Sequence, residues 1–186
     1  MTDLVLDPAR SRIRIHTSAE GLLARLAHDL ELAISDLSGK ASGDVDVDGA
    51  AGTASLEVPL RAVHVTGILG KDGRVDEHGL SPAERRDIVA KMQKEVFHAG
   101  PDGVVRAEAH LDGRKARIKL LPPNGKTFET VVPIDLRADG DSTLATGSFD
   151  VSLKAIGSDV VKGPVGAFRV SDKVRVTFDL VFSRVS

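Results

Sequence analysis

The sequence contains no cysteine, tryptophan or tyrosine, and its only aromatic side chains are six phenylalanines among 186 residues. Without cysteine the chain has no disulfides, no zinc–thiolate sites and no thiol nucleophile. Without tyrosine and tryptophan it lacks the stacking platforms that bind single-stranded nucleic acid and the aromatic belts of membrane proteins. A chain of this length can still bury a sizeable aliphatic core, so one domain without covalent staples is expected.

Charge and hydropathy exclude further classes. The 25 basic and 27 acidic side chains are spread along the chain without a basic tract, so nucleic acid is not an expected partner. No apolar run approaches the roughly 20 residues of a membrane span. The first eight residues carry Asp3 and Asp7 where a signal peptide is basic, which predicts a cytoplasmic protein, or a periplasmic one if a leader has been removed.

Apolar and polar residues alternate along much of the chain, as in half-buried antiparallel strands. The pattern is clearest from Lys173 to Phe182, where the even positions are apolar. Strands with the same pattern are predicted at 12–17, 29–36, 53–60, 104–110, 114–120, 129–136 and 143–153.

Turn pairs separate these strands and supply the positive-φ residue that tight connections need. They are Asp48-Gly49, Asp102-Gly103, Asp112-Gly113, Asn124-Gly125 and Asp139-Gly140, of which the third and fourth predict hairpins. Many short strands at this spacing indicate a sandwich or barrel, and closure removes exposed edges. We therefore predict an all-β fold, an antiparallel lipocalin-like barrel of about eight strands, as one domain over residues 1–186.

One segment predicts a helix, over residues 82–96. Ser81 is a suitable N-cap, Pro82 suits the first turn, and Glu84 completes a capping box. Its apolar stripe of Ile88, Val89, Met92 and Val96 suits a cover for the barrel mouth or flank. A short helical turn is also expected within residues 20–30, and a long loop over Val65–Ser81.

Motifs for catalysis are weak. The six histidines lack metalloprotease or zinc-site spacing, and Asp76-Glu77-His78 is better explained as a solvated loop than as a metal site. No G-x-S-x-G elbow is present. We predict no metal, no cofactor and no enzymatic activity. The pair His28-Asp29 could place a titratable group at a cavity entrance, although a structural role for His28 is favoured.

Three stretches together resemble the YceI-like proteins, lipocalin-like barrels whose periplasmic members carry polyisoprenoid lipids. They are the opening Asp7–Ile13, the His-centred junction Leu26–Leu30, and Gly147–Gly157 followed by Val170–Val176. Where the family often has Arg, two residues and Gly, this chain has Lys154 and Gly157, which keeps the charge but loses the bidentate fork. The resemblance implies an eight-stranded barrel able to enclose a lipid.

Three functions stay open at this point. The first is a non-catalytic carrier that holds an isoprenoid or other lipid chain inside the barrel. The second is a structural or partner-binding barrel with a filled core, for which a homodimer is one option. The third is an enzyme that uses His28, Asp29 or Lys154 at the cavity mouth. For the carrier, the predicted ligand-binding residues are Ile13, Ile15, His28, Leu30, Leu32, Leu56, Val58, Lys154, Val176, Phe178 and Leu180.

Overall fold

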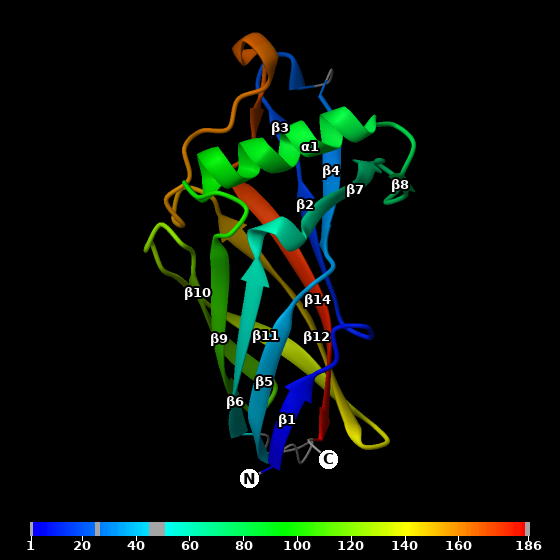
Figure 1. The fold of residues 1–186 in the computed structure, drawn as a ribbon, viewed down its shortest axis with the longest axis vertical. Coiled ribbons are helices and arrows are strands. Elements are labelled where there is room, and N and C mark those ends of the chain that lie inside the picture. Colours follow the sequence, from blue (N-terminus) through cyan, green and yellow to red (C-terminus); the bar gives the residue numbers. More distant parts are fainter. Residues whose placement is uncertain (1, 25–26, 45–50, 185–186) are drawn as a thin grey trace.

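The alternating segments form antiparallel strands that close into a barrel in a computed structural model, which describes residues 2–24, 27–44 and 51–184 (Figure 1). Eight strands form the closed ring, and the last pairs back onto the first, which confirms the predicted fold. In ring order they are β1 (Thr2–Leu6), β5 (Ser38–Asp44), β6 (Ala51–Pro59), β9 (Val104–Asp112), β10 (Lys115–Leu121), β11 (Phe128–Asp139), β12 (Ser142–Ser152) and β14 (Lys173–Arg184).

The sheet continues past this ring from the long strand β14. One edge of β14 pairs with β12 along its length. Its other edge pairs with two different strands, one after the other along β14. β2 (Arg12–Thr17) pairs with the stretch 175–179, and β1 pairs with 182–184. Between them, the N–H of Val181 donates to the buried Ser11 hydroxyl at 2.9 Å, so the turn before β2 satisfies the backbone where the partner strand changes.

Beyond β2 the extension contains β4 (Asp29–Ile34), β7 (Val63–Leu69) and the two-residue strand β8 (Val75–Asp76). β8 pairs only with Ile68 and Leu69 of β7. Within the described part of the chain no other strand covers the remaining outer edge of β7. The half of the barrel that contains β1 is therefore closed by backbone hydrogen bonds. The half that contains β2, β4 and β7 is open along the outer edge of β7.

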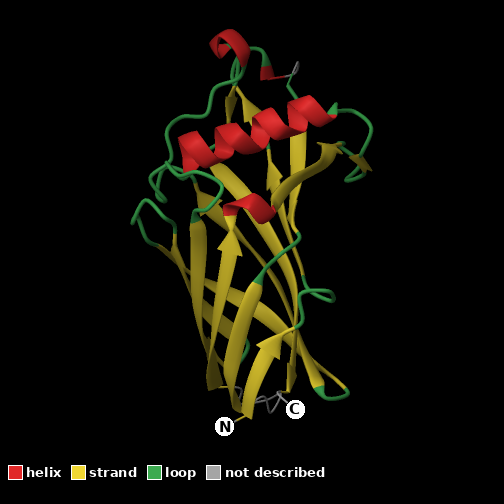
Figure 2. Ribbon diagram, viewed as in Figure 1, coloured by secondary structure: helices red, strands yellow, loops and turns green. Residues whose placement is uncertain are grey.

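The helix α1 (Pro82–Lys91) lies across the open half, as Figure 2 shows. Its start is as predicted: the Ser81 hydroxyl accepts from the N–H of Glu84, and the Glu84 carboxylate accepts from the N–H of Ser81. The predicted helical span is confirmed to Val96, but its last five residues, Met92–Val96, form a π-helical turn. The expected stripe of Ile88, Val89 and Met92 packs against the main apolar cluster.

Arg85 fastens this helix to the sheet. Its guanidinium donates to the carbonyl oxygens of Val65 at 2.7 Å and Thr66 at 2.8 Å, on the outer edge of β7. It also donates to the carbonyls of Leu80, at 3.3 Å, and Glu77. One side chain thus satisfies backbone acceptors that no strand covers.

A second, two-stranded sheet lies at the end of the molecule beyond α1 (Figure 1). It pairs β3 (Ala19–Glu20) with β13 (Arg169–Val170). A 3-10 turn at Pro164–Gly166 precedes β13, and another, η2 (Leu60–Ala62), joins β6 to β7.

Parts of the sequence-based prediction were wrong or are not covered. The long loop expected over Val65–Ser81 contains most of β7 and all of β8, and β1 and β5 were not predicted. β5 has the sequence SGKASGD, without the large apolar residues that mark a strand. The Asp48-Gly49 turn lies outside the described residues, as does part of the helical turn within 20–30, although Ala24 N–H does bond to Gly21 O at 3.1 Å.

Candidate functional site

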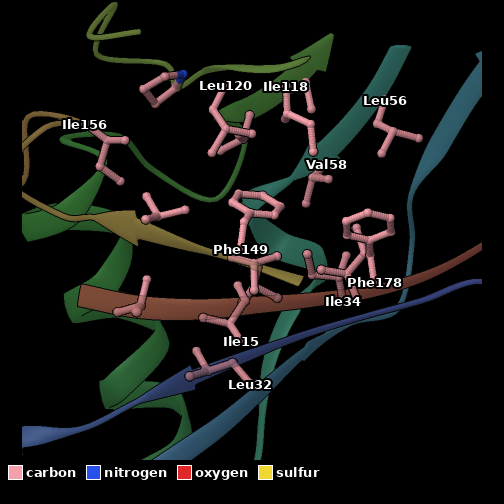
Figure 3. Close-up of a pocket in the computed structure, with 18 of the residues that line it drawn as sticks. Ile15, Leu32, Ile34, Leu56, Val58, Ile118, Leu120, Phe149, Ile156 and Phe178 are labelled. Carbon is pink, nitrogen blue, oxygen red and sulfur yellow. The ribbon is translucent and has the colours of Figure 1, made fainter. Parts of the chain in front are cut away.

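The barrel encloses a cavity of about 870 Å³, lined almost entirely by aliphatic and phenylalanine side chains (Figure 3). Successive residues of a strand point to opposite faces, so each strand contributes every second side chain to the interior. On β14 the lining residues are the even-numbered ones predicted from the alternation: Val174, Val176, Phe178, Leu180 and Phe182.

The cavity stays open because one wall has small side chains. Ala41 on β5, Ala54 on β6 and Ala109 on β9 are successive cross-strand partners, and all three line the cavity. In the ring order β9 lies opposite β14, which contributes Phe178 and Phe182. Alanine methyls on one wall do not reach the large side chains on the other, so the interior is hollow where a filled core would need leucine or phenylalanine.

The structure brings ten of the eleven predicted ligand-binding residues together around this cavity. Lys154 is not among them: its side chain is exposed in the turn after β12, where its N–H donates to the Asp172 carboxylate at 2.8 Å. Contact of the others with a ligand stays a prediction. Those ten are Ile13, Ile15, His28, Leu30, Leu32, Leu56, Val58, Val176, Phe178 and Leu180.

Sequence reasoning missed the contribution of other elements to the cavity. α1 adds Ile88 and the π-helical turn after it adds Met92; the predicted helical stripe contained both residues, but they were not assigned to the site. Phe149 on β12 also lies inside, with its ring centroid 6.3 Å from that of Phe178. The wall of alanines was not predicted, because only the strand register shows that Ala41, Ala54 and Ala109 lie side by side.

Polar residues gather where the cavity meets the surface. His28 directly precedes β4, Asp87 and Lys91 lie on α1, and Lys162 lies in the segment before β13. All four are exposed and border the cavity. Lys91 forms an ion pair with Glu95 at 3.2 Å. The cavity mouth therefore lies between α1 and the end of the molecule formed by β3, β13 and the turn at Pro164–Gly166.

The candidate catalytic pair separates in the structure. His28 borders the mouth, but the Asp29 carboxylate is not part of the lining and accepts from the N–H of Ala19 at 3.1 Å. Among the described residues no group of three or more histidine, aspartate or glutamate side chains is arranged to hold a metal ion. Asp76 accepts from the N–H of His78 at 2.9 Å, as in a local turn.

Two carboxyl groups have lowered pKa values, both through local hydrogen bonds. The Ser81 hydroxyl and then the Ser81 N–H lower the pKa of Glu84, and the nearby charge of His28 adds to the effect. The Lys154 N–H and then the Ser152 hydroxyl lower the pKa of Asp172. Both carboxylates stabilise turns and helix ends, and neither borders the cavity.

No helix in residues 2–24, 27–44 and 51–184 combines the length and the apolar character that crossing a bilayer requires. The compartment predicted from the first eight residues stays a prediction.

Comparison with known proteins identifies the fold. The crystal structure of Burkholderia cenocepacia BcnA matches with a TM-score of 0.64 and 18% identity, over 95% of this chain and 98% of the other. A polyisoprenoid binding domain from Saccharophagus degradans, implicated in plant cell wall breakdown, matches with a TM-score of 0.61 and 13% identity, over 100% of both chains. No protein-family profile and no curated protein matches the sequence. The two structures confirm the barrel fold that the resemblance to YceI-like proteins implied.

Proposed function

We propose that this protein is a non-catalytic carrier that holds one molecule with a long aliphatic chain, of isoprenoid or acyl type, inside its barrel. The observation that carries the proposal is the 870 Å³ cavity with its aliphatic lining. Its volume lies within the range of roughly 300–1,000 Å³ typical of small-molecule sites. Water in such a space would lack the two to four polar partners that a buried water needs, so an apolar occupant suits it better.

The cavity is long enough for a membrane lipid chain. Its lining residues on β14 extend from Val174 to Phe182, roughly 26 Å at about 3.3 Å per residue. A strand tilt of about 35–45° shortens this to roughly 20 Å along the barrel axis. One leaflet of a bilayer has a hydrocarbon thickness of about 15 Å. A chain that spans one leaflet therefore fits lengthwise.

The free energy of burial favours long chains. Each methylene buried contributes about 0.8 kcal/mol, so a chain of about twenty carbons gains roughly 16 kcal/mol. Association costs an estimated ~4–15 kcal/mol in lost freedom. Short hydrocarbons barely exceed this cost, whereas long ones bind well. The name of the Saccharophagus degradans domain, a polyisoprenoid binding domain of the same fold, supports isoprenoids as the first chains to test.

The two alternatives are less favoured. A barrel with a filled core, the first alternative, would not contain a cavity of this volume. An enzyme would need its reacting groups close together at the mouth. His28 borders the mouth, but Asp29 does not and instead bonds to the backbone of Ala19.

The test is native mass spectrometry of the purified protein, as isolated and after incubation with farnesol, geranylgeraniol and palmitic acid. Ala54→Phe fills the alanine wall, and Ser55→Phe adds the same ring one residue later, on the outer face. Wild type and Ser55→Phe are expected to form one-to-one adducts whose abundance increases with the chain length of the ligand. Ala54→Phe is expected to lose the adduct with the longest chain. No adduct with any chain, or equal binding by both variants, would overturn the proposal.

A further inference from the structure

Two apolar side chains at the end of the molecule that holds the cavity mouth are almost fully exposed. Leu22 and Val165 have 94% and 105% of their reference surface areas exposed. The other large apolar side chains that are strongly exposed in the described residues are Val5, Val131 and Val160, at 48–59%. Of these, Val160 immediately precedes the segment 161–170, which borders the mouth. Single exposed apolar residues are ordinary on protein surfaces, but fully exposed ones grouped at one opening are not.

The segments with Leu22 and Val165 are joined into one unit, residues 19–24 and 161–170, here called the mouth platform. β3 and β13 pair within it, and Arg169 forms an ion pair with Glu20 at 2.6 Å. A side chain added at Gly21 would contact the backbone of Phe168 at 3.7 Å, so the two turns pack closely. Leu22 and Val165 therefore belong to one paired unit of the fold.

Val165 is held in a conformation that valine rarely adopts. Its φ is 54°, in the left-handed region where a β-branched side chain is strained. Pro164 and Gly166 flank it, and the side chain points into solvent while also bordering the cavity. A glycine or asparagine would fit this turn without strain. Strain that displays an apolar side chain at an opening is typical of a binding surface.

The platform is continuous with the cavity. Val161, Lys162, Gly163, Phe168 and Val170 all border the mouth from this side. The ring of Phe168 lies on Gly163, within 2.5 Å of a methyl built there, and adds an apolar side chain to the cavity lining. Apolar surface thus extends from the interior to Val165, while Leu22 lies on the β3 side of the same platform and does not line the cavity.

From these observations we propose that the mouth platform docks onto the surface of a phospholipid bilayer, with Leu22 and Val165 inserted among the headgroups, so that the aliphatic chain passes between membrane and cavity without crossing water. This inference depends on the proposed carrier function, because only a ligand that resides in the membrane requires such a path. Two inserted side chains give shallow, reversible binding, as loading and release require.

The experiment is flotation of the purified protein with phosphatidylcholine vesicles, with and without phosphatidylglycerol. Wild type is expected to float with the vesicles, and Leu22→Ser with Val165→Ser to lose association by about tenfold or more. The matched control, Val5→Ser with Val131→Ser, removes half-exposed valines from the barrel wall and is expected to float like wild type. Equal flotation of both double variants, or none by wild type, would overturn the proposal.

A second assay separates this inference from the proposed function. Geranylgeraniol is supplied either from an ethanol stock in solution or within vesicles, and its uptake is followed by native mass spectrometry. The platform variant is expected to load like wild type from solution and several-fold more slowly from vesicles. Wild type that loads from solution but equally fast from vesicles with the platform variant refutes the platform alone. Absence of loading from either source, together with the absence of adducts with farnesol and palmitic acid, refutes the carrier function.

Light scattering tests a protein partner for the same surface. A concentration-dependent dimer of wild type that is lost in Leu22→Ser with Val165→Ser, without flotation of wild type, would assign the platform to a second copy and overturn the bilayer proposal.

Discussion

The ring of Phe178 on β14 lies over Gly147, its cross-strand partner on β12. A methyl group built on Gly147 would come within 2.6 Å of Cζ and 3.0 Å of Cε1 of that ring. Directly paired residues share a face of the sheet, so the Phe178 ring and any side chain placed at position 147 both face the barrel interior. The absence of a side chain at 147 therefore lets the ring lie flat against the wall and leaves space beside it.

Gly147→Ala is expected to push the Phe178 ring into the cavity. Overpacking of this kind costs about 1–3 kcal/mol of folding stability, and the displaced ring shortens the chain that the barrel accepts. Thermal unfolding and native mass spectrometry with prenols measure the two effects. Adding Phe178→Leu is expected to restore much of both, whereas Ser148→Ala, on the exposed outer face, changes neither. Simple additivity of the two substitutions would show that the contact has no such role.

Arg85→Ala is expected to loosen α1 from the outer edge of β7. It leaves backbone carbonyls of Val65 and Thr66 without their charged donor, which costs roughly 2–3 kcal/mol. Hydrogen exchange in α1 and β7 should increase more than exchange in β12. The neighbouring exposed Arg86 makes no side-chain hydrogen bond within the described residues, so Arg86→Ala should change stability by less than about 0.5 kcal/mol. Equal effects of the two variants would contradict the anchoring role of Arg85.

Stability is expected to fall in acid partly through Asp172. Hydrogen bonds from the Lys154 N–H and the Ser152 hydroxyl lower its pKa in the folded protein. The stabilisation is therefore present above the ordinary carboxyl pKa and is lost as the pH falls through the lowered value. Ser152→Ala removes one donor and should move the pKa of Asp172 back toward its ordinary value. Carboxyl-carbon NMR titration measures this, with Ser55→Ala as control; an unchanged titration in Ser152→Ala would refute the assignment.

Relieving the strain at Val165 is expected to raise stability while weakening the proposed membrane contact. Val165→Asn keeps the left-handed conformation with less strain, so the protein should gain up to about 1 kcal/mol. Gly166→Ala has the opposite expectation, since φ at Gly166 is 69° and alanine is strained there. Thermal unfolding distinguishes the two. A loss of stability in Val165→Asn would mean that the valine makes a contact that outweighs its strain.

The fold was predictable where strands have large apolar residues in strict alternation. β14 and β2 contributed half of the predicted residues that line the cavity, and Ser81, Pro82 and Glu84 located the helix start. β5 escaped because glycine, serine and alanine occupy its length, and β7 because Gly67 and the adjacent turn glycines resemble a loop. Tertiary pairing, not local preference, makes these segments strands.

The hollow interior was not predictable, because the same alternation serves a filled core and a tunnel. The deciding feature is the juxtaposition of Ala41, Ala54 and Ala109 across three strands, opposite phenylalanines on the other wall. These residues are far apart in sequence, so their alignment depends on register. The mouth residues on α1 escaped for a similar reason: the helix pattern shows which face is apolar but not which opening it borders.

The break in the wall at β7 has a consequence for how the interior can be reached. Side chains of α1 and the single guanidinium of Arg85, not a ladder of backbone bonds, cover that half of the barrel. Displacing the helix would leave every pairing of the eight-stranded ring intact. Under the proposed carrier function, a ligand then enters without any unfolding of the ring. A side chain such as Ile88, which α1 contributes to the cavity lining, can therefore change the space for that ligand without altering a strand pairing of the ring.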